Sequence, residues 1–178
     1  MNTEGFHKLE DDVIRFRAME MEDAKTIHEY ASNPDVKKFI GWPLSITMED
    51  TNELVSGMIG KEAAGTHLYA TVIAKDTDQI VGTVMVFNFN KEANHAEVGY
   101  VFHHEYWNKG YGTRSIALID KFVFTELGLH KLNARVTDVN IGSKRILEKN
   151  GYTHEGLQKD QDFVDGKYYD LALLAKFA

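Results

Sequence analysis

The most constraining feature of the chain is a change of hydrophobic period at residue 67. From there, "HLYATVIAK" (residues 67–75) and "QIVGTVMVFNFN" (79–90) are rich in β-branched and aromatic residues and repeat with a period of two. A polar "DTDQ" joins them like a hairpin turn, and a turn-like "KEAN" precedes a third run, "HAEVGYVFH" (95–103). This pattern predicts three consecutive antiparallel strands.

Helices and further strands are predicted on both sides of this unit. Residues 12–19 alternate as a strand, and residues 47–64 begin with Thr47 and Asp50 in a capping-box arrangement and continue with helical spacing. After residue 110 an apolar stripe predicts a core-facing helix that ends at Gly128. The remaining expected elements are a helix over 20–33, a strand over 131–138, a helix over 140–151, and strands over 152–160 and 168–177.

Composition limits the class of protein. The 178 residues are 43% hydrophobic, enough for one core, so we expect a single domain spanning residues 1–178. The absence of cysteine excludes thiolate chemistry, and a net charge of -7 argues against a nucleic-acid partner. We expect a soluble cytoplasmic protein with no membrane partner, because no apolar run or signal-peptide layout is present. The acidity suits a cationic substrate or simply solubility.

Two glycines, Gly110 and Gly112, stand one residue apart where the helix after residue 110 should begin. A strand followed by "NKGYGT" and then a helix is typical of an anion site, in which bare backbone amides approach a phosphate and Lys109 adds positive charge. The stretch matches neither the Walker loop nor the dinucleotide-binding fingerprint, so a plain tight turn is the alternative.

A second polar group, Asn140 and Ser143, lies where the strand over 131–138 meets the next helix. Asn140 occupies an N-cap position, and capping alone is one interpretation. The other is that both side chains border a cleft beside the glycine pair. The "HHE" at residues 103–105 is predicted to be structural, because adjacent histidines on a strand point to opposite faces and a third metal ligand is missing.

Together these segments resemble the GNAT superfamily of acyl-CoA-dependent N-acetyltransferases, and within it the RimJ/RimL ribosomal-protein N-terminal acetyltransferases. The resemblance rests on "AEVGYVFHHEYWNKGYGT", "FVFTELGLHKLNARV", "NIGSKRILEKNGYTHEG" and "DGKYYD", in that order. It implies an α/β (α+β) fold with a mixed, mostly antiparallel sheet of about seven strands, splayed between the fourth and fifth and flanked by about four helices.

The resemblance also implies a site for acetyl-CoA as co-substrate, with no metal. The strand over 98–102 would pair with the pantetheine amides, the backbone over 108–113 would hold the pyrophosphate, Asn140 would bond the pantetheine arm, and an N–H near residue 100 or 101 would stabilise the oxyanion. Glu97 is the implied base or amine-orienting carboxylate, and Ser143 would lie near the sulfur. The implied cofactor-binding residues are Tyr100, Val101, Phe102, Asn108, Lys109, Gly110, Tyr111, Gly112, Thr113, Asn140 and Ser143.

Two departures from the family pattern bear on function. Leu147 stands where many members place a tyrosine acid, which favours Ser143 as donor to the thiolate, and Arg114 replaces a common Glu and is available for phosphate. The expected acceptor is a primary amine, either a small molecule or a protein N-terminus, with Trp42 and Glu97 as substrate-binding residues and residues 39–46 and 159–167 forming the pocket. A homodimer is possible, and the alternative function is a non-catalytic acyl-CoA sensor.

Overall fold

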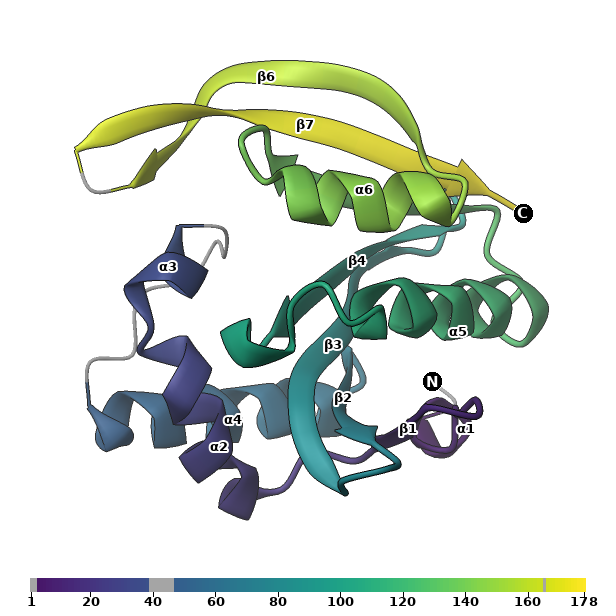
Figure 1. Cartoon of the computed structure of the whole chain (residues 1–178). Helices are drawn as coiled ribbons and strands as arrows, with labels where there is room; N and C mark the ends of the chain where they lie inside the picture. Colours follow the sequence, from purple (N-terminus) through teal and green to yellow (C-terminus); the bar gives the residue numbers. More distant parts are fainter. Residues whose placement is uncertain (1–2, 39–46, 165) are drawn as a thin grey trace.

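The computed structural model describes residues 3–38, 47–164 and 166–178. In this part of the chain, seven strands form one sheet in the order β1-β2-β3-β4-β5-β7-β6 (Figure 1). The strands are β1 (Ile14–Arg17), β2 (Leu68–Ala74), β3 (Gln79–Asn90), β4 (His95–Phe102), β5 (Lys131–Thr137), β6 (Thr153–Val164) and β7 (Lys167–Phe177). The helices are α1 (Thr3–His7), α2 (Ala24–Ala31), α3 (Pro34–Lys37), α4 (Met48–Ala63), α5 (Tyr111–Thr125) and α6 (Ile141–Lys149), with short 3-10 turns η1 (Met21–Asp23) and η2 (His104–Tyr106).

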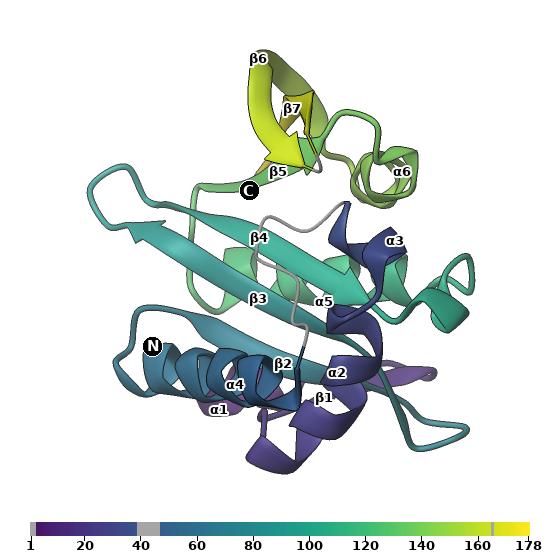
Figure 2. The ribbon, with the colours of Figure 1, turned by 90° about the vertical axis from the view of Figure 1, so that its left-hand side faces the viewer.

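Strands β2, β3 and β4 are antiparallel neighbours, as the period of two predicts. Tyr69 pairs with Met85, which pairs in turn with Gly99, so one row of residues crosses all three strands. Every residue of β2 is buried, because helices cover both faces of the sheet at this point. Figure 2 shows α2 and α4 on one face and α5 on the other.

The two faces of the sheet carry separate cores. Val98 and Phe102 of β4 belong to the core that also contains Ile119 of α5, whereas Val101 belongs to the core shared with α2 and α4. Successive strand residues point to opposite faces, so β4 contributes alternately to each core. Glu97, Gly99 and Val101 therefore share the α2/α4 face, and Tyr100 shares the α5 face.

The sheet divides between β4 and β5. These strands are parallel and pair only from His95 with Lys131 to Glu97 with Asn133. Beyond Glu97, β4 stays in register with β3 and β5 stays in register with β7, so the sheet opens like a V (Figure 2). The predicted splay between the fourth and fifth strands is confirmed, and it leaves two strand edges facing each other without ladder partners.

Most predicted elements are confirmed, and the differences are short helices. Thr47 and Asp50 form the expected capping box, with the Thr47 N–H donating to the Asp50 carboxylate at 2.8 Å. Gly128 adopts the positive φ of 63° that ends α5. Helices α1 and α3 have five and four residues, too few for the apolar face of an amphipathic helix to show as a periodic pattern. No helix in the described ranges is long and apolar enough to cross a bilayer.

Candidate functional site

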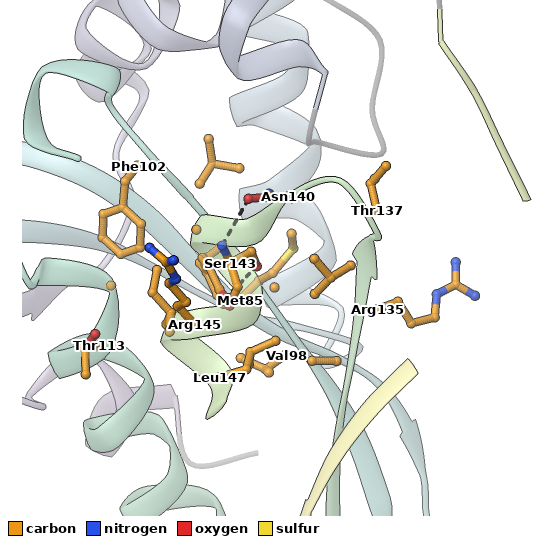
Figure 3. A pocket seen from close by; sticks show the side chains of 18 of the residues that line it. Met85, Val98, Phe102, Thr113, Arg135, Thr137, Asn140, Ser143, Arg145 and Leu147 are labelled. Atoms are coloured by element: carbon orange, nitrogen blue, oxygen red, sulfur yellow. Dashed lines mark hydrogen bonds between the residues drawn. The ribbon is translucent and has the colours of Figure 1, made fainter. Parts of the chain in front are cut away.

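A cleft of about 980 Å³ occupies the opening between β4 and β5. This volume is at the upper end of the usual range for small-molecule sites. Its walls come mainly from β3, β4, the turn before α5, β5 and α6, with further residues from α3, α4, β2, β6 and β7. Figure 3 places Phe102, Thr113 and Arg145 toward one end of the cleft and Arg135 toward the other.

The first end is formed by the start of α5. Asn108 and Gly110 have positive φ angles of 63° and 86°, which turn the chain sharply before the helix. The first helical bond runs from the Arg114 N–H to the Gly110 carbonyl at 3.1 Å, so the three amides before Arg114 lack intrahelical acceptors. The cap residue is Gly110, which offers no side chain to satisfy them. Converging free amides at a helix N-terminus form a cradle for an anion.

The two glycines of this cradle are required for different reasons. At Gly110 an added Cβ would meet nothing within 4 Å, so the positive φ is what favours glycine there. At Gly112 an added Cβ would lie 2.6 Å from Ile146 Cδ1 and 3.3 Å from Phe102 Cε2. The absence of a side chain at Gly112 therefore allows α5 and α6 to approach each other. The sequence suggests only close approach of a phosphate as the reason for this glycine.

Cations near this cradle come partly from unexpected positions. Arg145 and Lys149, one helical turn apart on α6, both line the cleft, whereas Lys109 does not and holds its Nζ 5.0 Å from the Tyr106 ring centroid. Arg114 donates to Asp11 at 2.8 Å and to Asp12 at 2.7 Å. These two carboxylates engage the guanidinium, so we do not assign Arg114 to phosphate.

The middle of the cleft carries hydroxyl groups. The Asn140 Oδ1 accepts from the Ser143 N–H at 3.0 Å, which confirms Asn140 as the N-cap of α6. The Ser143 Oγ lies 2.7 Å from the hydroxyl of Tyr100, which also donates to the Ser143 carbonyl at 3.2 Å (Figure 3 shows Ser143 and its bond to Asn140). Burial raises the pKa of Tyr100, so its hydroxyl remains protonated and available as a donor at neutral pH.

Glu97 lies at the second end, where β4 and β5 part. Its side chain is only 15% exposed, so Glu97 is not a solvent-facing strand residue. The Asn88 amide donates to its Oε2 at 3.1 Å, and the Arg135 Nε lies 3.4 Å from its Oε1. The carboxylate is therefore held in one orientation at the edge of the cleft.

Most of the residues implied by the resemblance meet in this cleft. Those that line it are Glu97, Tyr100, Val101, Phe102, Asn108, Gly110, Tyr111, Gly112, Thr113, Asn140 and Ser143. Lys109 does not line it, and Trp42, with residues 39–46, lies outside the described residues. The sequence reasoning missed the side chain of Tyr100 as a partner of Ser143, and it missed Arg145 and Lys149, whose four-residue spacing on a predicted helix was the available signal.

The histidine pair after β4 is arranged differently from the expectation. β4 ends at Phe102, so His103 and His104 are not on a strand and do not point to opposite faces. Their rings stack with centroids 4.6 Å apart, and His103 accepts from the Glu105 N–H at 3.2 Å as the cap of η2. Among the described residues there is no group of three potential metal ligands.

Comparison with known proteins identifies the family. The model of the acetyltransferase (GNAT) domain matches residues 14–153, which is most of the chain. The uncharacterized N-acetyltransferase YnaD of Bacillus subtilis (strain 168) is 31% identical over 162 residues, covering 88% of this chain and 91% of YnaD. The spermidine N(1)-acetyltransferase of Escherichia coli (strain K12) is 27% identical over 158 residues, covering 87% of this chain and 81% of that protein.

Solved structures show the same architecture. An acetyltransferase of the GNAT family from Bacillus anthracis is 28% identical and has a TM-score of 0.84, covering 95% of this chain and 97% of its own. The ribosomal L7/L12 α-N-protein acetyltransferase RimL, solved in complex with coenzyme A, shares the fold with a TM-score of 0.85 at 18% identity, covering 94% and 95% of the two chains. RimJ/RimL enzymes are thus one kind among several similar proteins. The chain belongs to the GNAT family of acetyltransferases and is an N-acetyltransferase.

Proposed function

We propose that the protein transfers an acetyl group from acetyl-CoA to a primary amine by direct attack within a ternary complex. The observation that carries this proposal is the single cleft that joins an anion cradle at α5 to an oriented carboxylate, Glu97, along an unpaired strand edge. Acetyl-CoA presents a pyrophosphate, then a pantetheine arm, then a thioester. The anion cradle, the strand edge and the carboxylate would meet these groups in that order.

The residues at the cradle fit the pyrophosphate of coenzyme A. The amides of Tyr111, Gly112 and Thr113 would hold its oxygens, and Arg145 and Lys149 would add charge from α6. Along residues 98–102, the edge of β4 that lacks a partner strand would pair with the amides of the pantetheine arm, as an added strand does. Bound in this way, acetyl-CoA supplies an activated acetyl group as a thioester.

The chain's own residues divide the chemistry of transfer. Glu97 would orient the acceptor amine and take its proton, directly or through water, because only a neutral amine attacks a thioester. A backbone N–H at Tyr100 or Val101 would stabilise the oxyanion as the nitrogen–carbon bond forms. As the carbon–sulfur bond breaks, Ser143 would donate to the sulfur. The Tyr100 hydroxyl would then turn from the Ser143 carbonyl to the Ser143 Oγ, 2.7 Å away, and replenish its proton.

This hydroxyl pair would replace the tyrosine that many family members place at the position of Leu147. Leu147 is fully buried in the core and cannot supply a proton. The features that suggested a non-catalytic sensor were Leu147 and Arg114, and both are explained by packing and by ion pairs with the N-terminal segment.

The named relatives suggest two kinds of acceptor. One is a protein N-terminus, as for RimL, and the other is a small amine, as for spermidine N(1)-acetyltransferase. The test is to measure thiol release from acetyl-CoA with a panel of amines and peptides, beside a calorimetric titration with acetyl-CoA alone. The proposal predicts saturable binding and amine-dependent release. Binding with no release for any amine would contradict it.

A further inference from the structure

The acceptor end of the cleft has an aromatic wall formed by His67, Tyr69 and Phe87. The His67 ring lies nearly parallel to the Tyr69 ring at 5.4 Å and to the Phe87 ring at 5.9 Å, with interplanar angles of 5° and 10°. All three residues line the cleft. Phe87 also pairs across the sheet with Glu97, so the wall and the carboxylate are adjacent on the α2/α4 face.

The aromatic wall is uncharged at neutral pH. Burial, and then the charge of Lys61, lower the pKa of the His67 imidazole, and burial raises the pKa of Tyr69 to about 12. A neutral aromatic wall is suited to a flat aromatic group, since paired rings stabilise each other beyond the area they bury.

The opposite side of Glu97 is cationic. Among the described residues, the terminal nitrogens of Arg135 have no hydrogen-bond partner, and its side chain is 54% exposed. Within the described ranges, its one ion pair joins its Nε to the Glu97 Oε1 at 3.4 Å. A guanidinium fork that is open in this way is suited to a carboxylate.

The charges at this end do not suit a polyamine. Lys61, Arg135 and Glu97 line it. A second carboxylate of the cleft, Asp162, lies at the open end of β5, where it accepts from Thr137 at 3.0 Å. A polyamine would bring further positive charges toward Lys61 and Arg135, and like charges in proximity are unfavourable.

We propose, on the basis of the function proposed above, that the acceptor is a free α-amino acid with an aromatic side chain. Its ammonium would pair with Glu97, its carboxylate with Arg135, and its ring with the aromatic wall. Across the sheet, the aromatic wall comes first, then Glu97 on β4 and then Arg135 on β5, so the ring, the ammonium and the carboxylate would each meet a matching partner. Glu97 and Arg135 are close enough to contact two charges carried on one carbon.

The transfer balances with no further reactant. The ammonium loses one proton to Glu97 and then to water. The neutral nitrogen forms a bond to the thioester carbon, the carbon–sulfur bond breaks, and the sulfur leaves with the electron pair and takes a proton from Ser143. The nitrogen's second proton returns to Ser143 through solvent or Tyr100. The products are the N-acetyl amino acid, free coenzyme A and one released proton.

The test compares kcat/KM for matched amines with the full chain and acetyl-CoA. Phenylalanine and its amide differ in the carboxylate and are compared at equal concentrations of the neutral amine, because the ammonium of the amide is more acidic. Phenylalanine and cyclohexylalanine differ in aromaticity; spermidine and a peptide with N-terminal phenylalanine represent the relatives' acceptors. We expect phenylalanine to exceed its amide by about tenfold, the value of one charge-assisted contact. We expect it to exceed cyclohexylalanine by about threefold and to be preferred over spermidine and the peptide.

Two variants locate the effect. Arg135→Gln should remove the preference for phenylalanine over its amide. The control is Arg15→Gln, which alters an arginine of β1 that is paired with Asp78, and this variant should retain the preference. Phe87→Leu should remove the preference over cyclohexylalanine, while Phe89→Leu, which packs against the α5-side core and does not line the cleft, should retain it.

The failures are distinguishable. Equal rates for phenylalanine and its amide, or acetylation confined to spermidine or peptides, would overturn the acceptor class while leaving acetyl transfer intact. Absence of release from every amine would overturn the proposed function and this inference together.

Discussion

Gly112 of α5 packs against Ile146 of α6 so closely that a Cβ on the glycine would lie 2.6 Å from the Ile146 Cδ1. The contact explains why the second glycine of the cradle is needed even before a phosphate is considered. It also fixes the distance between the two helices that form one end of the cleft, so packing and anion binding are coupled at this point.

Gly112→Ala should therefore lower the free energy of unfolding by about 1–3 kcal/mol, the usual effect of overpacking. The double variant Gly112→Ala/Ile146→Val, which removes Cδ1, should recover most of the loss. Urea denaturation of the three proteins measures both effects. If the double variant were as unstable as the single one, the helix contact would not be the cause.

Gly110→Ala should weaken acetyl-CoA binding as well as stability. Alanine at a φ of 86° costs about 1 kcal/mol, and relaxation of that turn would disperse the converging amides. Gly128 has a similar φ of 63° at the other end of α5, so Gly128→Ala is a matched control that should cost stability alone. Calorimetric titration with acetyl-CoA separates the two, and equal affinities for both variants would remove Gly110 from the anion site.

Arg145→Gln should raise the Kd for acetyl-CoA by about tenfold, through loss of one charge-assisted contact to phosphate. Arg114→Gln should leave that Kd near the wild-type value, because Asp11 and Asp12 already bind this guanidinium. The Kd of dephospho-CoA and of pantetheine, measured with the same variants, shows which part of the ligand is involved. An unchanged Kd for Arg145→Gln would show that α6 does not contribute to the phosphate site.

The sequence predicts the strands and the long helices because their apolar periods extend over many residues, and it predicts the splay only through the family resemblance. It does not reveal the contacts that join distant segments. The contacts of Gly112 with Ile146, Tyr100 with Ser143 and Arg114 with Asp11 each require the folded chain. In the sequence, nothing distinguishes His67, Tyr69 and Phe87 from ordinary strand residues. Their rings come together because of the register between β2 and β3.

Ser143→Ala and Tyr100→Phe should each lower kcat by about tenfold to a hundredfold, within the range that general acid catalysis contributes, while the Kd for acetyl-CoA stays near wild type. Because the two hydroxyls act in sequence on one proton, the double variant should lose little more than either single variant. Additive losses would show that they act independently, and a wild-type rate for Ser143→Ala would leave it as a structural residue of α6.

The measurement that tests the account most directly is transfer of an isotope-labelled acetyl group from acetyl-CoA to an amine, followed by mass spectrometry of the product, with wild type and Glu97→Gln. The account predicts N-acetylated product with the wild type, and a kcat/KM lower by about a hundredfold for Glu97→Gln at an unchanged Kd for acetyl-CoA. A Glu97→Gln variant that transfers at the wild-type rate, or a wild type that acetylates no amine, would contradict it.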